Sequence, residues 1–421
     1  MQRTAPRLWP KAISAAPAKA QASKAGGIFI ERERLLKTFK VTHGEIIDFE
    51  NLLQADKNAS QGKHYRDENL AFSAHKSDEL IKLHNELTYF PKDGIPGNPL
   101  ESAYHVGRYR RKKIYEPKPR IIMALQYRDR VVQWAYYQKL NPLFDKQYIE
   151  HSYGCRVGKG TTRARAQLQY WLRMASRSAK KWYVLKLDIA KYFYRVDHEI
   201  LMKILSKHIR DPLILRDLYN LINCEDTAFG LPAGVQPELC NQEDWLYNRG
   251  MPIGNLTSQM FANLYLNELD QYAKHTLKIH YYIRYMDDVI ILHHDKAYLG
   301  VVKDEIEQFL NEVLHLQLNN KTAIRPCRSG IDFVGFRIWA THRKLKKKTV
   351  KKIKRSVKNL ARLRVEGEIA ESTLKQAIAS YKGILSHCDS YGLRRELNRI
   401  WKDSGRKAAV CAENMGRRVK P

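Results

Sequence analysis

The sequence has few features of membrane proteins or of disulfide-stabilised proteins. Its 421 residues include 6 cysteines, and their spacing matches neither a zinc site nor a disulfide framework. No apolar stretch reaches the ~18–20 residues that a membrane-spanning helix needs. Acidic residues are scarce beside basic ones, 44 against 74. These absences predict a cytoplasmic protein with reduced thiols and no membrane partner.

The excess of positive charge indicates a polyanionic partner. The formal charge is +30 and the isoelectric point is near 9.8. Lysine and arginine in such excess attract phosphate backbones whatever their sequence. The 24 tyrosines and 7 tryptophans add aromatic surface on which bases can stack. Ribosomal and membrane-surface proteins are equally basic, so charge alone leaves those classes open.

The most informative segment joins two apolar runs through a pair of carboxylates. Residues 281–292 read Tyr-Tyr-Ile-Arg-Tyr-Met-Asp-Asp-Val-Ile-Ile-Leu, with the carboxylates at Asp287 and Asp288. Because neighbouring strand residues point to opposite faces, an Asp pair inside a strand would bury one charge. We therefore expect a tight turn that keeps both carboxylates at the surface, where a divalent cation can neutralise them. An ordinary charged hairpin turn is the alternative.

A further carboxylate follows another predicted strand. Residues 183–187 form a largely apolar strand, and Asp188 comes directly after it. Carboxylates brought together in this way can hold two divalent ions about 3.5–4 Å apart, the arrangement used for in-line phosphoryl transfer. Hard oxygen ligands that leave positions open for water and phosphate suit Mg²⁺. The alternative for Asp188 is a helix N-cap.

These segments, in this order, resemble the palm of prokaryotic reverse transcriptases. The resemblance covers roughly residues 100–340 and implies an α+β right-hand polymerase fold with fingers, an antiparallel palm sheet and an α-helical thumb. It implies an RNA-directed DNA polymerase, a nucleotidyltransferase that extends a 3′ hydroxyl with dNTPs on an RNA template. The similar segments are 118–122, 127–133 and 152–161 in the fingers, and 188–197, 249–270, 285–288, 318–324 and 330–336 in the palm.

The same resemblance implies the roles of residues at the catalytic centre. Asp188 and Asp287 would ligate two Mg²⁺ ions, for which Mn²⁺ is an alternative, and Asp288 would support them as a third carboxylate. The main-chain carbonyl of Ile189 would complete the shell of one ion. We therefore expect the three aspartates to be the catalytic residues, and the three together with Ile189 to form the metal site.

Four residues would bind the incoming nucleotide. The ring of Phe193 would lie beneath the sugar and collide with a 2′-hydroxyl, which favours deoxynucleotides; a core phenylalanine is the alternative. Arg120 and Lys118 would hold the triphosphate, because guanidinium geometry matches phosphate. Lys321 would donate a proton to the departing pyrophosphate, or else lie solvated at the surface.

Two positions depart from the pattern of group II intron enzymes. Ile253 stands where most relatives carry Gln, and Gln259 stands where intron enzymes carry Pro. Both are expected to line the nucleotide and template site. An aliphatic residue cannot make the hydrogen bond of an amide, so we hypothesise relaxed fidelity; simple packing of Ile253 is the alternative. The resemblance is greatest to the enzymes of diversity-generating retroelements and of antiphage defence.

Composition divides the chain into six stretches, one of which contains an insertion. The insertion, residues 223–248, is rich in Gly, Pro and acidic residues and is expected to be a flexible surface loop; a docking surface is the alternative. The stretches are a disordered basic arm (1–27), an N-terminal helical region (28–90), fingers (91–180), a palm (181–340), a helical thumb (341–402) and a loose basic tail (403–421).

Three functional classes follow from these features. An active reverse transcriptase is favoured, and its expected partners are an RNA template, a DNA primer or product, and dNTPs. A structured non-coding RNA or an accessory protein is a further candidate partner in a diversity-generating or defence system. The alternatives are an RNA-directed RNA polymerase and a catalytically idle RNA-binding scaffold.

Overall fold

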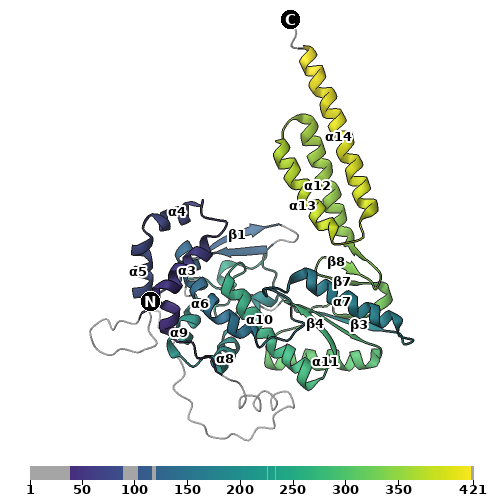
Figure 1. The fold of residues 1–421 in the computed structure, drawn as a ribbon. Helices are drawn as coiled ribbons and strands as arrows, with labels where there is room; N and C mark the ends of the chain where they lie inside the picture. Colours follow the sequence, from purple (N-terminus) through teal and green to yellow (C-terminus); the bar gives the residue numbers. More distant parts are fainter. Residues whose placement is uncertain (1–37, 89–102, 116–119, 225, 233, 419–421) are drawn as a thin grey trace. The chain divides into compact units, whose positions relative to one another are not determined.

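The computed structural model describes residues 38–88, 103–115, 120–224, 226–232 and 234–418 (Figure 1). The basic arm expected over residues 1–27, and Lys118, lie outside these ranges. In the part of the chain that is described, no helix is both long enough and apolar enough to cross a membrane.

Short helices make up the described part of the N-terminal region. A capping box begins the first of them, in which Thr42 and Glu45 satisfy each other's backbone N–H groups. Leucines three and four positions apart in the last helix, Leu80, Leu83 and Leu87, are fully buried and give it one apolar face. The helices are α2 (His43–Ile47), α3 (Phe49–Ser60), α4 (Asp67–Ala74) and α5 (Lys76–Leu87).

A two-stranded ribbon and two long helices follow. The outer strand, β1 (Arg110–Ile114), is exposed along its whole length because four of its five residues are cationic. It pairs antiparallel with β2 (Arg120–Ala124). Helix α6 (Tyr127–Asp145) packs against α3 and against α10 (Leu256–Gln271). Helix α7 (Gly160–Arg177) has an apolar face that packs on β4 (Tyr281–Tyr285) and β8 (Phe336–Ile338).

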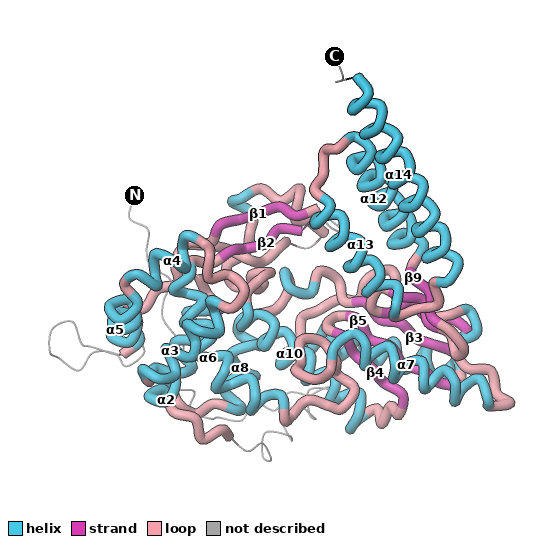
Figure 2. The backbone as a smooth tube through the Cα atoms, turned by 45° about the horizontal axis from the view of Figure 1, so that its top comes forward, coloured by secondary structure: helices cyan, strands magenta, loops and turns pink. Residues whose placement is uncertain are grey.

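The central sheet has four antiparallel strands in the order β4-β5-β3-β6 (Figure 2). Helix α11 packs on three of these strands, and α10 packs on α6, α8 and α11. The middle residues of β3, β4 and β5 are mostly apolar and buried. The elements are β3 (Tyr183–Asp188), α8 (His198–His208), α9 (Pro212–Ile222), α10 (Leu256–Gln271), β4 (Tyr281–Tyr285), β5 (Asp288–His293), α11 (Lys296–Val313) and β6 (Ala323–Pro326), with a π-helical turn (Tyr272–Thr276) after α10 and 3₁₀ turns at Tyr192–Tyr194, Gln242–Asp244 and Cys327–Ser329.

The 223–248 insertion is not a loose surface loop. Phe229, Leu231 and Trp245 are buried, and they share a core with residues of β2. Arg111 of β1 lies over the Trp245 ring, 4.7 Å from its centroid. The apolar residues in the insertion therefore outweigh its acidic ones, and they fasten it to the β1–β2 ribbon.

A three-stranded antiparallel sheet leads into the C-terminal helices. It is formed by β7 (Ile331–Phe333), β8 (Phe336–Ile338) and β9 (Arg343–Leu345). The helices of the expected thumb are α12 (Lys347–Glu366), α13 (Glu371–Ser386) and α14 (Tyr391–Arg418). The last of these corrects the expectation of a loose tail from residue 403, because the helix continues to Arg418. Residues 403–418 contain three alanines and no proline, a composition that lets the preceding helix propagate.

Candidate active site

A two-residue turn joins β4 to β5 and carries the first of the paired aspartates. Met286 and Asp287 form the turn, whereas Asp288 is already the first residue of β5. Met286 has a φ of 53°, a backbone conformation that is strained for residues other than glycine. The first central residue of a type II′ hairpin turn requires a positive φ. The strained residue therefore lies directly beside a catalytic candidate, where such strain is often found.

Strand register brings the three aspartates together. Asp188, the last residue of β3, lies directly opposite Asp288 across the β3–β5 pairing. The main-chain N–H of Ile189 donates to the carbonyl of Asp287 at 3.4 Å. The juxtaposition arises because β3 ends and β5 begins at the same edge of the sheet. Residues that are a hundred positions apart in the sequence thus meet at one site.

Burial and mutual repulsion disfavour the charged forms of two of these groups. Burial raises the pKa of Asp287, and the nearby Asp188 raises it further, while Arg120 and Lys186 act in the opposite direction. Burial likewise raises the pKa of Asp288 to about 6, against the opposing effect of Lys186. The Lys186 ammonium lies 2.7 Å from Asp288 Oδ1. Both paired carboxylates are half-buried. The expectation that both lie in the turn is corrected at Asp288, which is the first residue of β5 and forms an ion pair with Lys186.

The donor set fits a metal that takes much of its shell from substrate and water. Within the described ranges, no group of three or more His, Cys, Asp or Glu side chains is arranged to hold a metal ion. Mg²⁺ is commonly held by one or two carboxylates together with waters and phosphates, and Asp188 and Asp287 supply that number. A divalent cation between them would also reverse the repulsion that raises the pKa of Asp287.

Several of the residues predicted to bind the nucleotide lie on segments that are joined by backbone hydrogen bonds. The carbonyl of Phe193 accepts from Met251 N at 2.7 Å, and that of Ile253 accepts from Met123 N at 3.0 Å. Phe193 is half-buried, with its ring 5.6 Å from that of Tyr192. Ile253 is half-buried against the core shared by the β1–β2 ribbon and the insertion. The segment that begins at Gly250 thus connects the strand bearing Arg120 to the turn bearing Phe193.

The remaining residues predicted to bind substrate make fewer contacts with the rest of the protein. Arg120 is exposed at the start of β2, and its charge partly opposes the burial that raises the pKa of Asp287. Gln259 is half-buried on α10. Lys321 is exposed, and its backbone N–H donates to Asn319 Oδ1 at 3.2 Å. The charge of Arg120 therefore acts on Asp287, one of the predicted metal ligands.

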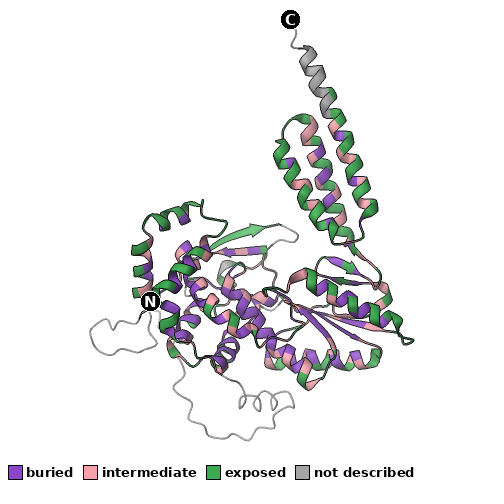
Figure 3. Cartoon of the chain, viewed as in Figure 1, coloured by how far each residue is buried: buried purple, intermediate pink, exposed green. Residues whose placement is uncertain are grey.

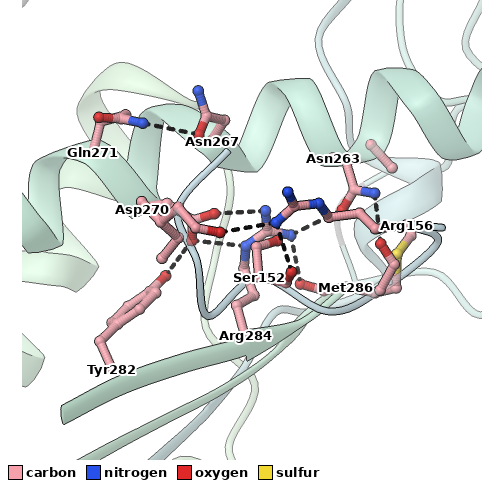
Figure 4. Close-up of polar contacts among 12 residues, drawn as sticks. Ser152, Arg156, Asn263, Asn267, Asp270, Gln271, Tyr282, Arg284 and Met286 are labelled. Atoms are coloured by element: carbon pink, nitrogen blue, oxygen red, sulfur yellow. Dashed lines mark hydrogen bonds and ion pairs between the residues drawn. The ribbon is translucent and has the colours of Figure 1, made fainter. Parts of the chain in front are cut away.

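Sequence reasoning missed a buried polar network beneath the catalytic turn (Figure 4). Arg284 and Asp270 are both fully buried and form an ion pair, with Nη2 and Oδ2 2.7 Å apart. Tyr282 also donates to Asp270, at 2.7 Å. The available signal was an arginine inside the otherwise apolar and aromatic strand 281–285, since a charge is rarely placed there without a partner.

The fold and the clustered aspartates define a right-hand polymerase of α+β type. The model of the family "Reverse transcriptase (RNA-dependent DNA polymerase)" matches residues 111–338, which is more than half of the chain. The chain therefore belongs to the reverse transcriptase family.

The curated relatives are distant, and this chain aligns with only part of the length of each. The chain is 26% identical over 266 residues to Protein YkfC of Escherichia coli (strain K12), covering 54% of this chain and 66% of that protein. It is 24% identical over 226 residues to the group II intron-encoded protein LtrA of Lactococcus lactis subsp. cremoris, covering 52% and 32%. Among solved structures, telomerase from Candida albicans with a fragment of telomeric RNA aligns at a TM-score of 0.43 and 15% identity, covering 80% of this chain and 58% of that one.

Proposed function

We propose that this protein is an RNA-directed DNA polymerase that extends a 3′ hydroxyl with dNTPs on an RNA template. The observation that carries the proposal is the β3–β5 register, in which Asp188 pairs with Asp288, together with the hydrogen bond from Ile189 N–H to the carbonyl of Asp287. Family membership supports an RNA template and a deoxynucleotide substrate. The charge of +30 supports tight contact with nucleic-acid backbones.

In this proposal the residues position groups and neutralise charge. Asp188 and Asp287 would hold the metal ions, with the carbonyl of Ile189 as a further ligand. Two Mg²⁺ ions, when bound, lower the pKa of the primer hydroxyl and neutralise charge on the α-phosphate and pyrophosphate. Asp288 would support the site as a third carboxylate, and its negative charge is offset by the ion pair with Lys186.

The substrate-binding residues act on different parts of the nucleotide. Arg120 holds the triphosphate; its side chain is exposed at a strand end, and its charge acts on Asp287. Phe193 lies beneath the sugar and excludes a 2′-hydroxyl by contact. Lys321 is the proton donor to pyrophosphate in this scheme, and its exposed side chain is free to swing towards a bound substrate. Lys118, Gln259 and Ile253 complete the template and nucleotide site.

For the biological setting, we propose a diversity-generating retroelement or an antiphage defence system. The basis is Ile253 and Gln259, which depart from the intron-enzyme pattern. A structured non-coding RNA or an accessory protein would then supply the template or primer. Sequencing the nucleic acid that copurifies with the protein tests this setting, because a retroelement template and host messenger RNA give different reads.

Primer extension tests the activity. The protein is given an oligo(dT) primer on poly(rA) with Mg²⁺, and dTTP or UTP is supplied. We expect extension with dTTP and at least tenfold less with UTP, and we expect Asp188→Asn to abolish both. Equal or greater use of UTP would indicate an RNA polymerase. A biological effect that survives Asp188→Asn would indicate a scaffold.

A further inference from the structure

The catalytic turn has a geometry that local sequence does not favour. Met286 adopts a φ of 53°, although it is not glycine. The turn immediately precedes the strand of Asp288 and includes Asp287 itself. Metal ligands must be held within a few tenths of an ångström. Contacts from outside the hairpin must therefore stabilise this conformation.

Arg284 makes those contacts from below the turn. Its Nη1 donates to the carbonyl of Met286 at 3.2 Å and to Asn263 Oδ1 at 3.4 Å. Its Nε and Nη2 donate to the two carboxylate oxygens of Asp270, each at 2.7 Å. The planar guanidinium is thereby oriented by a bidentate pair, and its remaining edge faces the main chain of the turn (Figure 4).

The loop at residues 151–154 holds the same turn from another direction. Asn263 Nδ2 donates to the carbonyl of Gly154 at 2.7 Å. A β-carbon at Gly154 would lie 2.7 Å from Met286 Sδ and 2.8 Å from Met286 N, which is closer than side chains approach. The glycine therefore lets this loop pack directly on the strained residue. Asn263 links the loop to Arg284, so one network reaches both sides of Met286.

Stability alone gives little reason for this arrangement. A buried ion pair is often no more stabilising than well-packed apolar residues of the same size. The other residues of the strand that carries Arg284 are apolar or aromatic. The network is thus better explained by the geometry it imposes on the turn.

We infer that Arg284, Asp270 and Asn263 are positioning residues that set the Met286 carbonyl and, through the peptide that follows, the Asp287 carboxylate for metal binding. The inference deepens the proposed polymerase function and depends on it. None of the three side chains contacts substrate in this scheme; they act through the turn.

The first test measures metal affinity without nucleic acid. Mn²⁺ is titrated into the whole protein and followed by electron paramagnetic resonance. We expect Asp270→Asn to weaken Mn²⁺ binding by about tenfold, the usual range for residues that support a metal ligand. Mn²⁺ binding by the wild type that depends on Asp188 and Asp287 would support the metal site even if the protein did not polymerise. The polymerase proposal and the positioning proposal can therefore fail separately.

A matched control removes an equally buried pair elsewhere. Arg216 Nε lies 2.7 Å from Asp217 Oδ1, and both side chains are almost fully buried. Asp217 also contacts His43 and Tyr136, and it lies on α9. We expect Asp217→Asn to lower the melting temperature as Asp270→Asn does, but to leave Mn²⁺ affinity unchanged. An equal loss of Mn²⁺ affinity in both variants would overturn the inference.

A second variant keeps the ion pair and covers the case in which Asp270→Asn does not fold. Asn263→Ala removes the bonds to Arg284 Nη1 and to Gly154 O and leaves the Arg284–Asp270 contact in place. We expect kcat for primer extension to fall by about tenfold, with KM for dNTP within twofold. A rise in KM with kcat unchanged, or no change in either, would overturn the inference.

Discussion

The central sheet is largely buried, whereas the thumb helices are largely exposed (Figure 3). The two regions also use charge in opposite ways. Under the catalytic turn, Arg284 and Asp270 have no exposed side-chain surface, and each charge is met by its partner. On α12, by contrast, only Ile353, Val357 and Ala361 are buried. These three residues lie four positions apart and form an apolar stripe, and most of the helix's lysines and arginines are exposed outside it.

The difference separates two tasks of a polymerase. Buried charges have defined partners and fixed geometry, so they can set the position of reacting groups. Exposed lysines keep their hydration and their freedom, so they attract a duplex without selecting a sequence. Substitutions in the two regions should therefore alter different measurements.

The largest expected effect is at the catalytic turn. Asp287→Asn should lower the rate of primer extension by about 10³-fold, because a ligand and its charge are lost. Its thermal stability should stay equal or rise, since burial raises the pKa of this carboxyl and the charged form is disfavoured. Melting curves and single-turnover kinetics check both results. A clear loss of stability would show that the aspartate serves the fold.

The next prediction concerns a titratable group in the main core. Burial lowers the pKa of His208 to about 4, while an unfolded histidine titrates near 6.5. The unfolded state therefore binds more protons below pH 6.5, and stability should fall as the pH drops from 6.5 towards 4. A lowering of this size corresponds to about 3 kcal/mol.

Denaturant unfolding at several pH values measures this effect. His208→Gln should flatten the decline between pH 6.5 and 4. His64→Gln provides the control, because His64 is exposed. If the two variants show the same dependence on pH, the acid sensitivity arises elsewhere.

A smaller effect should separate thumb charge from fold stability. Lys348, Lys351 and Lys358 are exposed on α12, and replacing all three with Gln should weaken binding of an RNA–DNA duplex by about tenfold. The slope of log affinity against log salt should become shallower by about three. Filter binding across a salt series measures both quantities, and the melting temperature should not change.

Neutralising Lys57, Lys82 and Lys203, which are exposed on other helices, is the matched control. A similar loss of affinity in this control would show that net charge, not the thumb surface, governs binding.

The smallest effect is expected at Ile253. Ile253→Gln should reduce misincorporation severalfold, because an amide can restore a polar constraint on the nucleotide. Ile253→Val keeps the apolar packing and should behave as the wild type. Sequencing of products made on one defined template compares the variants. An unchanged error spectrum in Ile253→Gln would indicate that this residue only packs.

Strands and turns were predicted correctly where the alternation of apolar and polar residues in the local sequence determines them. A strand ending at Asp188 and a hairpin around Asp287 are both present. The insertion at 223–248 was misjudged, because its acidic and glycine residues are conspicuous while the burial of Phe229 and Trp245 depends on a distant ribbon. The roles of Phe193, Arg120, Gln259 and Lys321 stay predictions, since they depend on a bound nucleotide.

By itself, the sequence determined the kinds of groups available: a carboxylate at a strand end, a carboxylate pair between apolar strands, and basic amphipathic helices. These depend on periodicity and on the chemistry of neighbouring residues. Only the tertiary structure decided which partners they meet. Strand register set Asp188 against Asp288, and helix packing placed Asp270 beside Arg284. The reason is physical: the pKa of a carboxyl and the strength of an ion pair depend on burial and distance, which arise between segments far apart in the chain.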